Sequence, residues 1–307
     1  RMRVPELGGE AWFFPNDRKI AAIAELLEQA RAIGADVEVI HYVPEQGCTV
    51  RVTGTDGILY GKVRADDRGV TATRIACLAA ARGADEVRLA QIVHCDVARR
   101  IQWQQAVAGE PLDAGAVLAE PAVWASRIET ALCAFHALPA PSGLSLIEPT
   151  ALGPAVTRRI ARMAGEMPEH AARLFDMAAR LERHADFTPA LALSHGDLHP
   201  ANLLWDGTSF ALIDLDTCSL APAARDYASL AAALTTKANA LGMPAAAMIG
   251  ELADASGAPA CEFYWFLAAS LIGERLYRSA TRLKPANREA LLALAEASLD
   301  ICEKQHA

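Results

Sequence analysis

The chain changes near residue 109 from a mixture of strands and helices to a mostly helical pattern. Before this point, short runs rich in β-branched residues alternate with two stretches of helical apolar periodicity. The expected elements are a helix over 19–34, strands over 37–43, 48–53 and 57–64, a helix over 70–82, and strands over 87–95 and 100–107. Pro44–Gly47 has the composition of a hairpin turn.

Long apolar-periodic helices dominate after residue 109. They are expected over 121–138, 155–167 and 168–185, and again from Pro222 to the end, with a short β-rich segment over 191–216. A small, strand-rich part followed by a larger helical part predicts an α+β protein with a cleft between them. The boundary is expected near 104–109, giving domains over 1–106 and 107–307.

Composition narrows the class of protein. Hydrophobic residues make up 52% and charged residues 21%, so a large core is expected. The net charge of −8 argues against a general nucleic-acid or membrane surface and fits a cationic substrate slightly better than an anionic one. Seven widely spaced cysteines without a Cys-x-x-Cys pair favour reduced thiols in a cytoplasmic protein. No apolar run is long enough to predict a membrane span.

The segment over 194–216 carries the clearest chemical signal. It reads Ser-His-Gly-Asp-Leu-His-Pro-Ala-Asn-Leu-Leu over 194–204 and Leu-Ile-Asp-Leu-Asp over 212–216. Asp206 and Gly207 lie between these apolar runs and predict a hairpin turn. Antiparallel pairing around this turn is expected to bring Asp214 beside Asn202, with Asp197 on the loop that precedes the ribbon.

Three such oxygen-bearing side chains suit Mg²⁺, which prefers carboxylate, amide and phosphate oxygens. Phosphoryl transfer needs a metal ion on the β- and γ-phosphates, a base near the acceptor hydroxyl, and positive charge near the phosphates. The Asp-x-x-x-x-Asn spacing of Asp197 and Asn202 matches a kinase catalytic loop, in which Asp accepts the hydroxyl proton and Asn holds metal. The sequence therefore predicts a kinase-type active site.

These residues resemble the aminoglycoside phosphotransferase and choline kinase-like family. The similarity lies in His-Gly-Asp-Leu-His-Pro-Ala-Asn at 195–202, Ile-Asp at 213–214 and Ala-Arg-Asp-Tyr-Ala at 224–228, and extends to Ala-Leu-Cys-Ala-Phe-His-Ala-Leu at 131–138. The resemblance implies a bilobal protein-kinase-like fold, with a small antiparallel-sheet N-lobe and a larger, mostly helical C-lobe. It also implies ATP and Mg²⁺ as cofactors and a small-molecule hydroxyl as acceptor.

The resemblance implies a role for particular residues. Asp197 would be the catalytic base, Asn202 and Asp214 the metal ligands, and His195 and Asp226 the residues that brace the catalytic loop. In the first part, Leu-Tyr-Gly-Lys-Val at 59–63 resembles the strand whose lysine, here Lys62, contacts the ATP phosphates. Residues 104–112 resemble the hinge, so adenine is expected to bond backbone groups at Gln105 and Val107.

One departure from kinase patterns leaves a question open. The helix expected over 70–82 has no glutamate to pair with Lys62, so either the partner comes from elsewhere, such as Asp66 or Asp67, or the lysine is held differently. A catalytically silent nucleotide-binding scaffold is therefore the alternative function. A protein kinase is less favoured, because the stretch from Asp214 to Asp226 leaves little room for an activation segment. Zinc binding by His195 and His199 explains fewer of the residues.

Aromatic and charged residues also occur on the helices expected in the tail. They are Glu262, Phe263, Tyr264, Trp265 and Phe266, followed by Arg275, Tyr277 and Arg278. The favoured interpretation is that they form the core and surface faces of a helix pair. The alternative is that part of this surface lines the acceptor site, whose chemistry no motif identifies.

Overall fold

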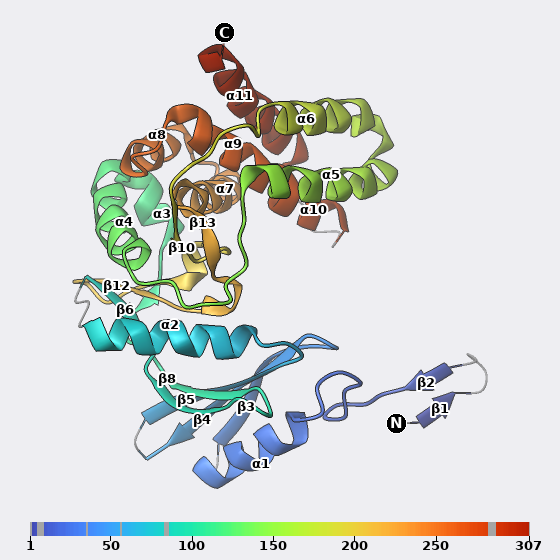
Figure 1. Cartoon of the computed structure of the whole chain (residues 1–307), viewed down its shortest axis with the longest axis vertical. Coiled ribbons are helices and arrows are strands. Elements are labelled where there is room, and N and C mark those ends of the chain that lie inside the picture. The colour runs from blue at the N-terminus through green and yellow to red at the C-terminus, as the bar shows by residue number, and fades with distance from the viewer. Residues whose placement is uncertain are drawn as a thin grey trace. The chain divides into compact units, whose positions relative to one another are not determined.

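The computed structural model describes residues 2–4, 9–34, 36–55, 57–82, 86–281 and 287–306. The chain forms two compact units (Figure 1). The first comprises Arg1–Ala108 together with Ala211–Asp216, and the second comprises Gly109–Phe210 and Thr217–Ala307. The chain thus returns once to the first unit, along the short segment that contains Asp214.

The first unit is built on an antiparallel sheet. Its described strands follow the order β3-β4-β5-β8-β7, and every pairing between neighbours is antiparallel. The bounds are β3 (Asp36–Val43), β4 (Gly47–Gly54), β5 (Gly57–Arg64), β7 (Ile92–Asp96) and β8 (Ile101–Gln105). Shorter strands are β1 (Met2–Val4) and β2 (Gly9–Ala11), which pair together, and β6 (Val87–Leu89).

Two helices pack on this sheet, α1 (Ile23–Ile33) and α2 (Arg68–Arg82) (Figure 1). Side chains alternate across a strand, so neighbouring residues of β5 face opposite sides. Gly61 faces α1, since a Cβ there would lie 2.8 Å from Leu26 and 2.7 Å from Trp103. Lys62 is directed to the other face, where it lines a pocket with Ala72 and Ala76 of α2. The sheet therefore places its apolar core under α1 and its polar residues under α2.

Two expectations for this part were wrong in detail. The first helix begins at Ile23 rather than residue 19, because Asp17 Oδ1 accepts the N–H groups of Lys19 (2.7 Å) and Ile20 (3.0 Å) in a turn. The strand expected over 87–95 is divided into β6 and β7. The hairpin at 44–47 and the strand Gly57–Arg64 are confirmed.

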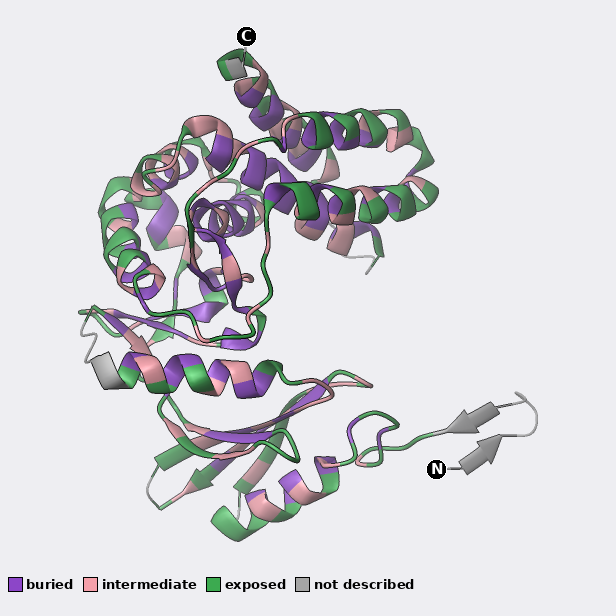
Figure 2. Cartoon of the chain, in the orientation of Figure 1, coloured by how far each residue is buried: buried purple, intermediate pink, exposed green. Residues whose placement is uncertain are grey.

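The second unit is mostly helical. Its helices are α3 (Ala114–Ala119), α4 (Pro121–His136), α5 (Pro149–Glu166), α6 (Ala171–Arg183), α7 (Ala224–Leu241), α8 (Ala246–Ala255), α9 (Ala260–Ser270), α10 (Tyr277–Thr281) and α11 (Arg288–His306). A π-helix, Leu271–Leu276, joins α9 to α10. Figure 2 shows α7 as largely buried, and its neighbour α9 contributes the fully buried Trp265. The core of this unit lies around these two helices.

Short strands position the loop that carries Asp197. The strand β10 (Leu191–Ser194) pairs antiparallel with β13 (Ser219–Pro222), and Ser194 lies opposite Ser219. The strand β11 (Leu203–Trp205) pairs with β9 (Glu110–Pro111). Next comes the predicted turn, in which Asp206 Oδ1 accepts the N–H of Thr208 at 2.8 Å, and then β12 (Phe210–Leu212). The strands β9 and β13 and the helix α3 were not expected from the sequence.

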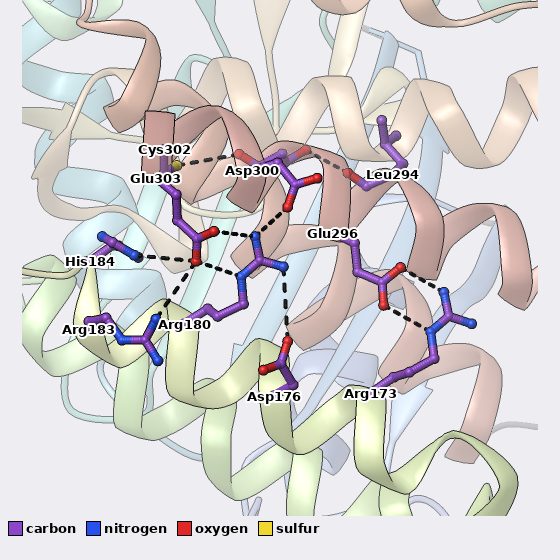
Figure 3. A network of polar contacts seen from close by, with 11 residues as sticks. Arg173, Asp176, Arg180, Arg183, His184, Leu294, Glu296, Asp300, Cys302 and Glu303 are labelled. Carbon is purple, nitrogen blue, oxygen red and sulfur yellow. Dashed lines mark hydrogen bonds and ion pairs between the residues drawn. The ribbon is translucent and has the colours of Figure 1, made fainter. Parts of the chain in front are cut away.

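Ion pairs join α6 to α11 on the other side of this unit (Figure 3). Arg173 binds Glu296 at 2.8 Å, and the buried Arg180 binds Glu303 at 2.9 Å. The helix expected over 168–185 begins with a 3₁₀ turn, Pro168–His170, before α6 starts. The α+β class and the division into a sheet-based and a helical part are confirmed.

Candidate active site

The loop after β10 depends on a glycine. Gly196 has a φ of +82°, a conformation that residues with a Cβ rarely adopt. A side chain at this position would also collide with the carbonyl oxygen of Thr217. The Thr217 hydroxyl in turn donates to the carbonyl of His195 at 2.9 Å. The backbone around 195–196 is therefore held tightly against the start of the return strand β13.

Asp226, in the first turn of α7, anchors the same loop. Its carboxylate is fully buried and accepts the N–H groups of His195 (2.8 Å) and Gly196 (3.0 Å). It also accepts the hydroxyl of Ser194 at 3.0 Å and lies 3.0 Å from Nε2 of His136 at the end of α4. One side chain therefore connects β10, the loop, α4 and α7.

These contacts explain the ionisation of Asp226. Burial by itself would raise the pKa of this carboxyl, because a buried charge loses its hydration. The hydrogen bonds from His136 and from the loop amides outweigh burial, and the pKa lies well below its usual range. An ionised carboxylate with this many donors is a rigid structural element.

Asp197 follows immediately and is directed outward. Its side chain is 28% exposed, and its Oδ1 lies 3.4 Å from Nη2 of Arg278 on α10. Its N–H donates to Nδ1 of the buried His195 at 3.4 Å. The backbone of Asp197 is thus fixed by the loop while its carboxylate stays accessible.

Asn202 closes the loop at the end of a 3₁₀ turn, Pro200–Asn202. Asn202 is only 6% exposed, and its Nδ2 donates to the carbonyl of Asp197 at 3.0 Å. This bond uses the amide nitrogen and leaves the side-chain oxygen as an available ligand atom. The half-buried His199 lies between these residues, and burial lowers its pKa below the usual value.

Lys62 and Asp214 meet in the first unit. The Nζ of Lys62 lies 2.9 Å from Oδ1 of Asp214, although 152 positions separate them in the chain. Burial alone would lower the pKa of Lys62, but the carboxylates of Asp216 and Asp214 outweigh this effect and raise it. Asp214 has a φ of +63°, a left-handed conformation that is uncommon outside glycine and is concentrated at functional sites.

This pairing corrects the partners that the sequence suggested for Lys62. Asp66 instead binds Arg68 at 2.8 Å, and Asp67 binds Arg100 at 2.6 Å. The helix glutamate missing from α2 is therefore replaced by a carboxylate from a distant segment.

A second ion pair lies beside Lys62. Arg64 is 3.3 Å from the buried Asp216. Within the described residues, Arg64 Nε, Asp216 Oδ1 and Gln102 Oε1 are buried without a hydrogen-bond partner. Buried polar atoms are normally paired, so this cluster is available for further interactions.

Gln105 and Val107 lie at the end of the sheet. The N–H of Gln105 donates to Gln91 (2.9 Å), and that of Ala106 donates to Ile58 (3.0 Å). Gln105 and Val107 also line a pocket of about 570 Å³ that is bordered by α2. The N–H groups of Gln105 and Ala106 are thus already used within the sheet-based unit.

Sequence reasoning missed His136 as a partner of Asp226. The only signal was the resemblance of residues 131–138 to a family helix, which gave no role to the histidine. Trp265 is part of the core, with its ring fully buried and Nε1 donating to Leu181 at 2.9 Å, so the helix-pair interpretation is right for this residue.

The described residues contain no group of three or more His, Cys, Asp and Glu side chains arranged to hold a metal ion, so His195 and His199 do not form such a cluster. No helix in the part of the chain that the structure describes is long and apolar enough to cross a membrane.

Solved structures with a similar fold come from phosphotransferases. A macrolide 2′-phosphotransferase from Brachybacterium faecium is 18% identical over 89% of this chain and 97% of its own, with a TM-score of 0.56. Spectinomycin phosphotransferase, solved with ADP and spectinomycin, is 12% identical over 91% of this chain and 97% of its own, with a TM-score of 0.60.

A choline/ethanolamine kinase family protein from Mesorhizobium loti is also similar. Its identity is 15% over 91% of this chain and 94% of its own, with a TM-score of 0.54. At these identities the likeness establishes the protein-kinase-like fold. A comparison with curated protein sequences gave no significant match.

The family model described as the phosphotransferase enzyme family matches residues 65–241. This range covers more than half of the chain and includes Asp197, Asn202, Asp214 and Asp226. It confirms the resemblance that the loop motif suggested. The chain belongs to the phosphotransferase enzyme family.

Proposed function

We propose that this protein is an ATP- and Mg²⁺-dependent kinase that phosphorylates a hydroxyl group of a small molecule, with Asp197 as catalytic base. The main support for the proposal is that Asp197 combines a fixed backbone with a partly exposed carboxylate. The Asp197 backbone is fixed through His195 and Asn202, whereas its carboxylate remains partly exposed. A catalytic base needs this combination of a fixed position and access to the acceptor.

The other residues divide the remaining tasks. Lys62 neutralises the ATP phosphates, and the adenine bonds backbone groups at Gln105–Val107. Asp226 and His195 keep the loop in shape. Asp197 orients the acceptor hydroxyl and accepts its proton as the oxygen attacks the γ-phosphate, and ADP leaves as the bond between its bridging oxygen and the γ-phosphorus breaks. The protein forms no covalent bond with the transferred phosphate, so catalysis depends mostly on positioning the reactants and on stabilising the charge of the transition state.

Asn202 and Asp214 each offer the kind of donor atom that a hard cation takes. Asn202 offers its side-chain oxygen, since its nitrogen already bonds Asp197, and Asp214 offers a half-exposed carboxylate. Amide and carboxylate oxygens are the ligands that Mg²⁺ accepts. Mg²⁺ bound there would neutralise charge on the β- and γ-phosphates.

The test of the base is Asp197→Ala, with ADP release followed over a panel of hydroxylated metabolites. We expect turnover to fall roughly 10²–10⁴-fold, the usual contribution of a positioned base. Asp176→Ala is the matched control, because that carboxylate is 66% exposed and lies on α6. Transfer within tenfold of wild type in Asp197→Ala would show that another group is the base.

One observation favours a second candidate, a catalytically silent nucleotide-binding scaffold. Lys62 binds Asp214, so the phosphate-binding cation and a metal ligand neutralise each other in the ligand-free chain. Calorimetry with Mg-ATP followed by the ADP-release panel separates the two functions. Nucleotide binding without turnover on any acceptor would favour the scaffold, whereas turnover on any acceptor would exclude it.

A further inference from the structure

Arginines gather around the carboxylate of Asp197 in the second unit. Arg278 on α10 is the nearest, at 3.4 Å. Arg275 belongs to the π-helix that precedes α10, and both arginines are close enough to act electrostatically on His199 in the same loop. π-helical turns are rare and often mark functional sites. The π-helix and the start of α10 together supply the two guanidinium groups near the candidate base.

Arg275 is the more unusual of the two. Its side chain is only 11% exposed, and its sole ion pair among the described residues is a long one, 3.5 Å, to the adjacent Glu274. Its Nε is buried without a hydrogen-bond partner in the same part of the chain. A buried guanidinium stays charged and needs acceptors for its donors, so an incomplete set of partners is costly.

The helix α5 holds this turn in place. Arg159 donates to the carbonyl of Gly273 at 2.6 Å, and its guanidinium lies 5.7 Å from the centre of the Tyr277 ring. Arg162 donates to the Tyr277 hydroxyl at 3.2 Å. These contacts fix the π-helix and add two more positive charges to the same region. The positions of Arg275 and Arg278 are thus supported from a second helix.

We propose that the acceptor substrate carries an anionic group, a carboxylate or a phosphate, which Arg275 and Arg278 bind while its hydroxyl faces Asp197. This inference rests on the proposed function and deepens it. Bound anion would supply the acceptors that Arg275 lacks and would draw Arg278 away from Asp197, leaving that carboxylate free to accept the hydroxyl proton.

The charge of this region argues against a cationic acceptor. An ammonium group placed beside Arg275 and Arg278 would be repelled by both guanidinium groups, and the two arginines of α5 add to the positive charge of the region. The carboxylates that pair with these two arginines are Asp197, which the reaction needs, and Glu274. The local charge therefore outweighs the expectation drawn from the net charge of −8.

The test compares acceptors that differ mainly in charge. ADP release would be measured with glycerol, glycerate and glycerol 3-phosphate, with sorbitol, gluconate and glucose 6-phosphate, and with choline and kanamycin. We expect turnover with anionic members only, and the carboxylate and phosphate series identify which anion is used. Arg278→Gln and Arg275→Gln should raise the acceptor KM roughly 10- to 100-fold, the scale of a lost charge-assisted hydrogen bond, while the KM for ATP changes little.

The conservative variant and a control separate this role from a merely structural one. Arg278→Lys should recover part of the acceptor affinity, because it restores the charge. Arg183→Gln removes a positive charge from the same unit, at a side chain that is 63% exposed and 3.9 Å from Glu303, and should leave the acceptor KM unchanged.

A binding measurement covers the case in which the panel lacks the natural acceptor. With Mg-ADP present, malonate and inorganic phosphate should raise the melting temperature of wild type and Arg183→Gln more than sodium chloride at equal ionic strength. The double variant Arg275→Gln/Arg278→Gln should lose this increase. An equal increase in the double variant would overturn the inference, as would turnover of neutral or cationic acceptors with an unchanged KM in Arg278→Gln. Absence of both nucleotide binding and turnover would instead defeat the proposed function.

Discussion

Two aspartates of the candidate active site have opposite surroundings. Asp226 in the second unit is fully buried, and donors from the loop, β10 and α4 surround its carboxylate. Asp214 in the first unit is 51% exposed and binds Lys62, in a left-handed backbone conformation. Beside it, Arg64 and Asp216 retain buried atoms that have no partner among the described residues.

The difference separates a structural carboxylate from one that is available for ligands. Asp226 has its hydrogen bonds satisfied by the protein itself, so we infer that its role is to fix the loop before any substrate arrives. Asp214 is half exposed and paired with a cation, so a metal ion could take the place of Lys62 beside it, while a phosphate could take the place of Asp214 beside Lys62. Preorganised positioning groups and incompletely paired binding groups are both expected where ligands are bound.

Breaking the Asp226 cluster should produce the largest effect. In Asp226→Asn the shape is kept, but the buried N–H groups of His195 and Gly196 lose a charged acceptor. We expect the free energy of unfolding to fall by about 3–5 kcal/mol, the scale of a buried pair that loses one partner. Urea denaturation measures this. Asp176→Asn, at an exposed position of α6, is the control, and an equal stability of the two variants would contradict the structural role.

Acid should remove the same contribution. The pKa of Asp226 is depressed in the folded state, so its stabilisation is present above the unfolded value of about 3.9 and is lost as pH falls from there toward the folded pKa. The stability difference between wild type and Asp226→Asn should therefore be constant from pH 7 to about 5 and shrink below about pH 4. Urea denaturation at a series of pH values tests this, and a difference that does not shrink as pH falls from about 4 to about 2 would assign the depressed pKa to another group.

Local sequence signals predicted much of this molecule. The turn at Pro44–Gly47 and the strand Gly57–Arg64 follow from short-range composition, and the structure contains both. The loop from Asp197 to Asn202 was identified because its motif lies within a few residues. Each of these depends on neighbours in the chain, where turn chemistry and periodicity are informative.

Pairings between distant segments could not be predicted in the same way. Lys62 and Asp214 are 152 positions apart, and His136 and Asp226 are 90 apart. No periodicity links such residues, and only the fold brings them together. The start of the first helix was predicted too early for a similar reason. Residues 19–22 continue the helical pattern, but Asp17 forms the turn that precedes the helix. The hydroxyl of Tyr42, which is distant in the sequence, donates to Asp17 at 2.8 Å and supports this turn.

A smaller effect on stability, with a large effect on activity, is expected at Lys62. In Lys62→Gln we expect the free energy of unfolding to change by less than about 1 kcal/mol, because the half-exposed Asp214 can be hydrated when its largely buried partner loses its charge. Phosphoryl transfer should fall by at least about 10²-fold, since a positive charge aimed at the transition state is lost. Denaturation and ADP release on the same sample measure both. A loss of stability matching that of Asp226→Asn would remove the distinction between the two sites.

The smallest effects are expected at the partners that the sequence first suggested for Lys62. Asp66 and Asp67 form exposed pairs with Arg68 and Arg100, and such pairs contribute about 0–1 kcal/mol. Asp66→Asn and Asp67→Asn should therefore leave turnover within about twofold of wild type, whereas Asp214→Asn, which removes the same charge from the residue that Lys62 binds, should abolish most of it. If Asp66→Asn lowered turnover as far as Asp214→Asn does, Lys62 would exchange partners during the reaction, and the carboxylate that matters would be the one close to it in sequence.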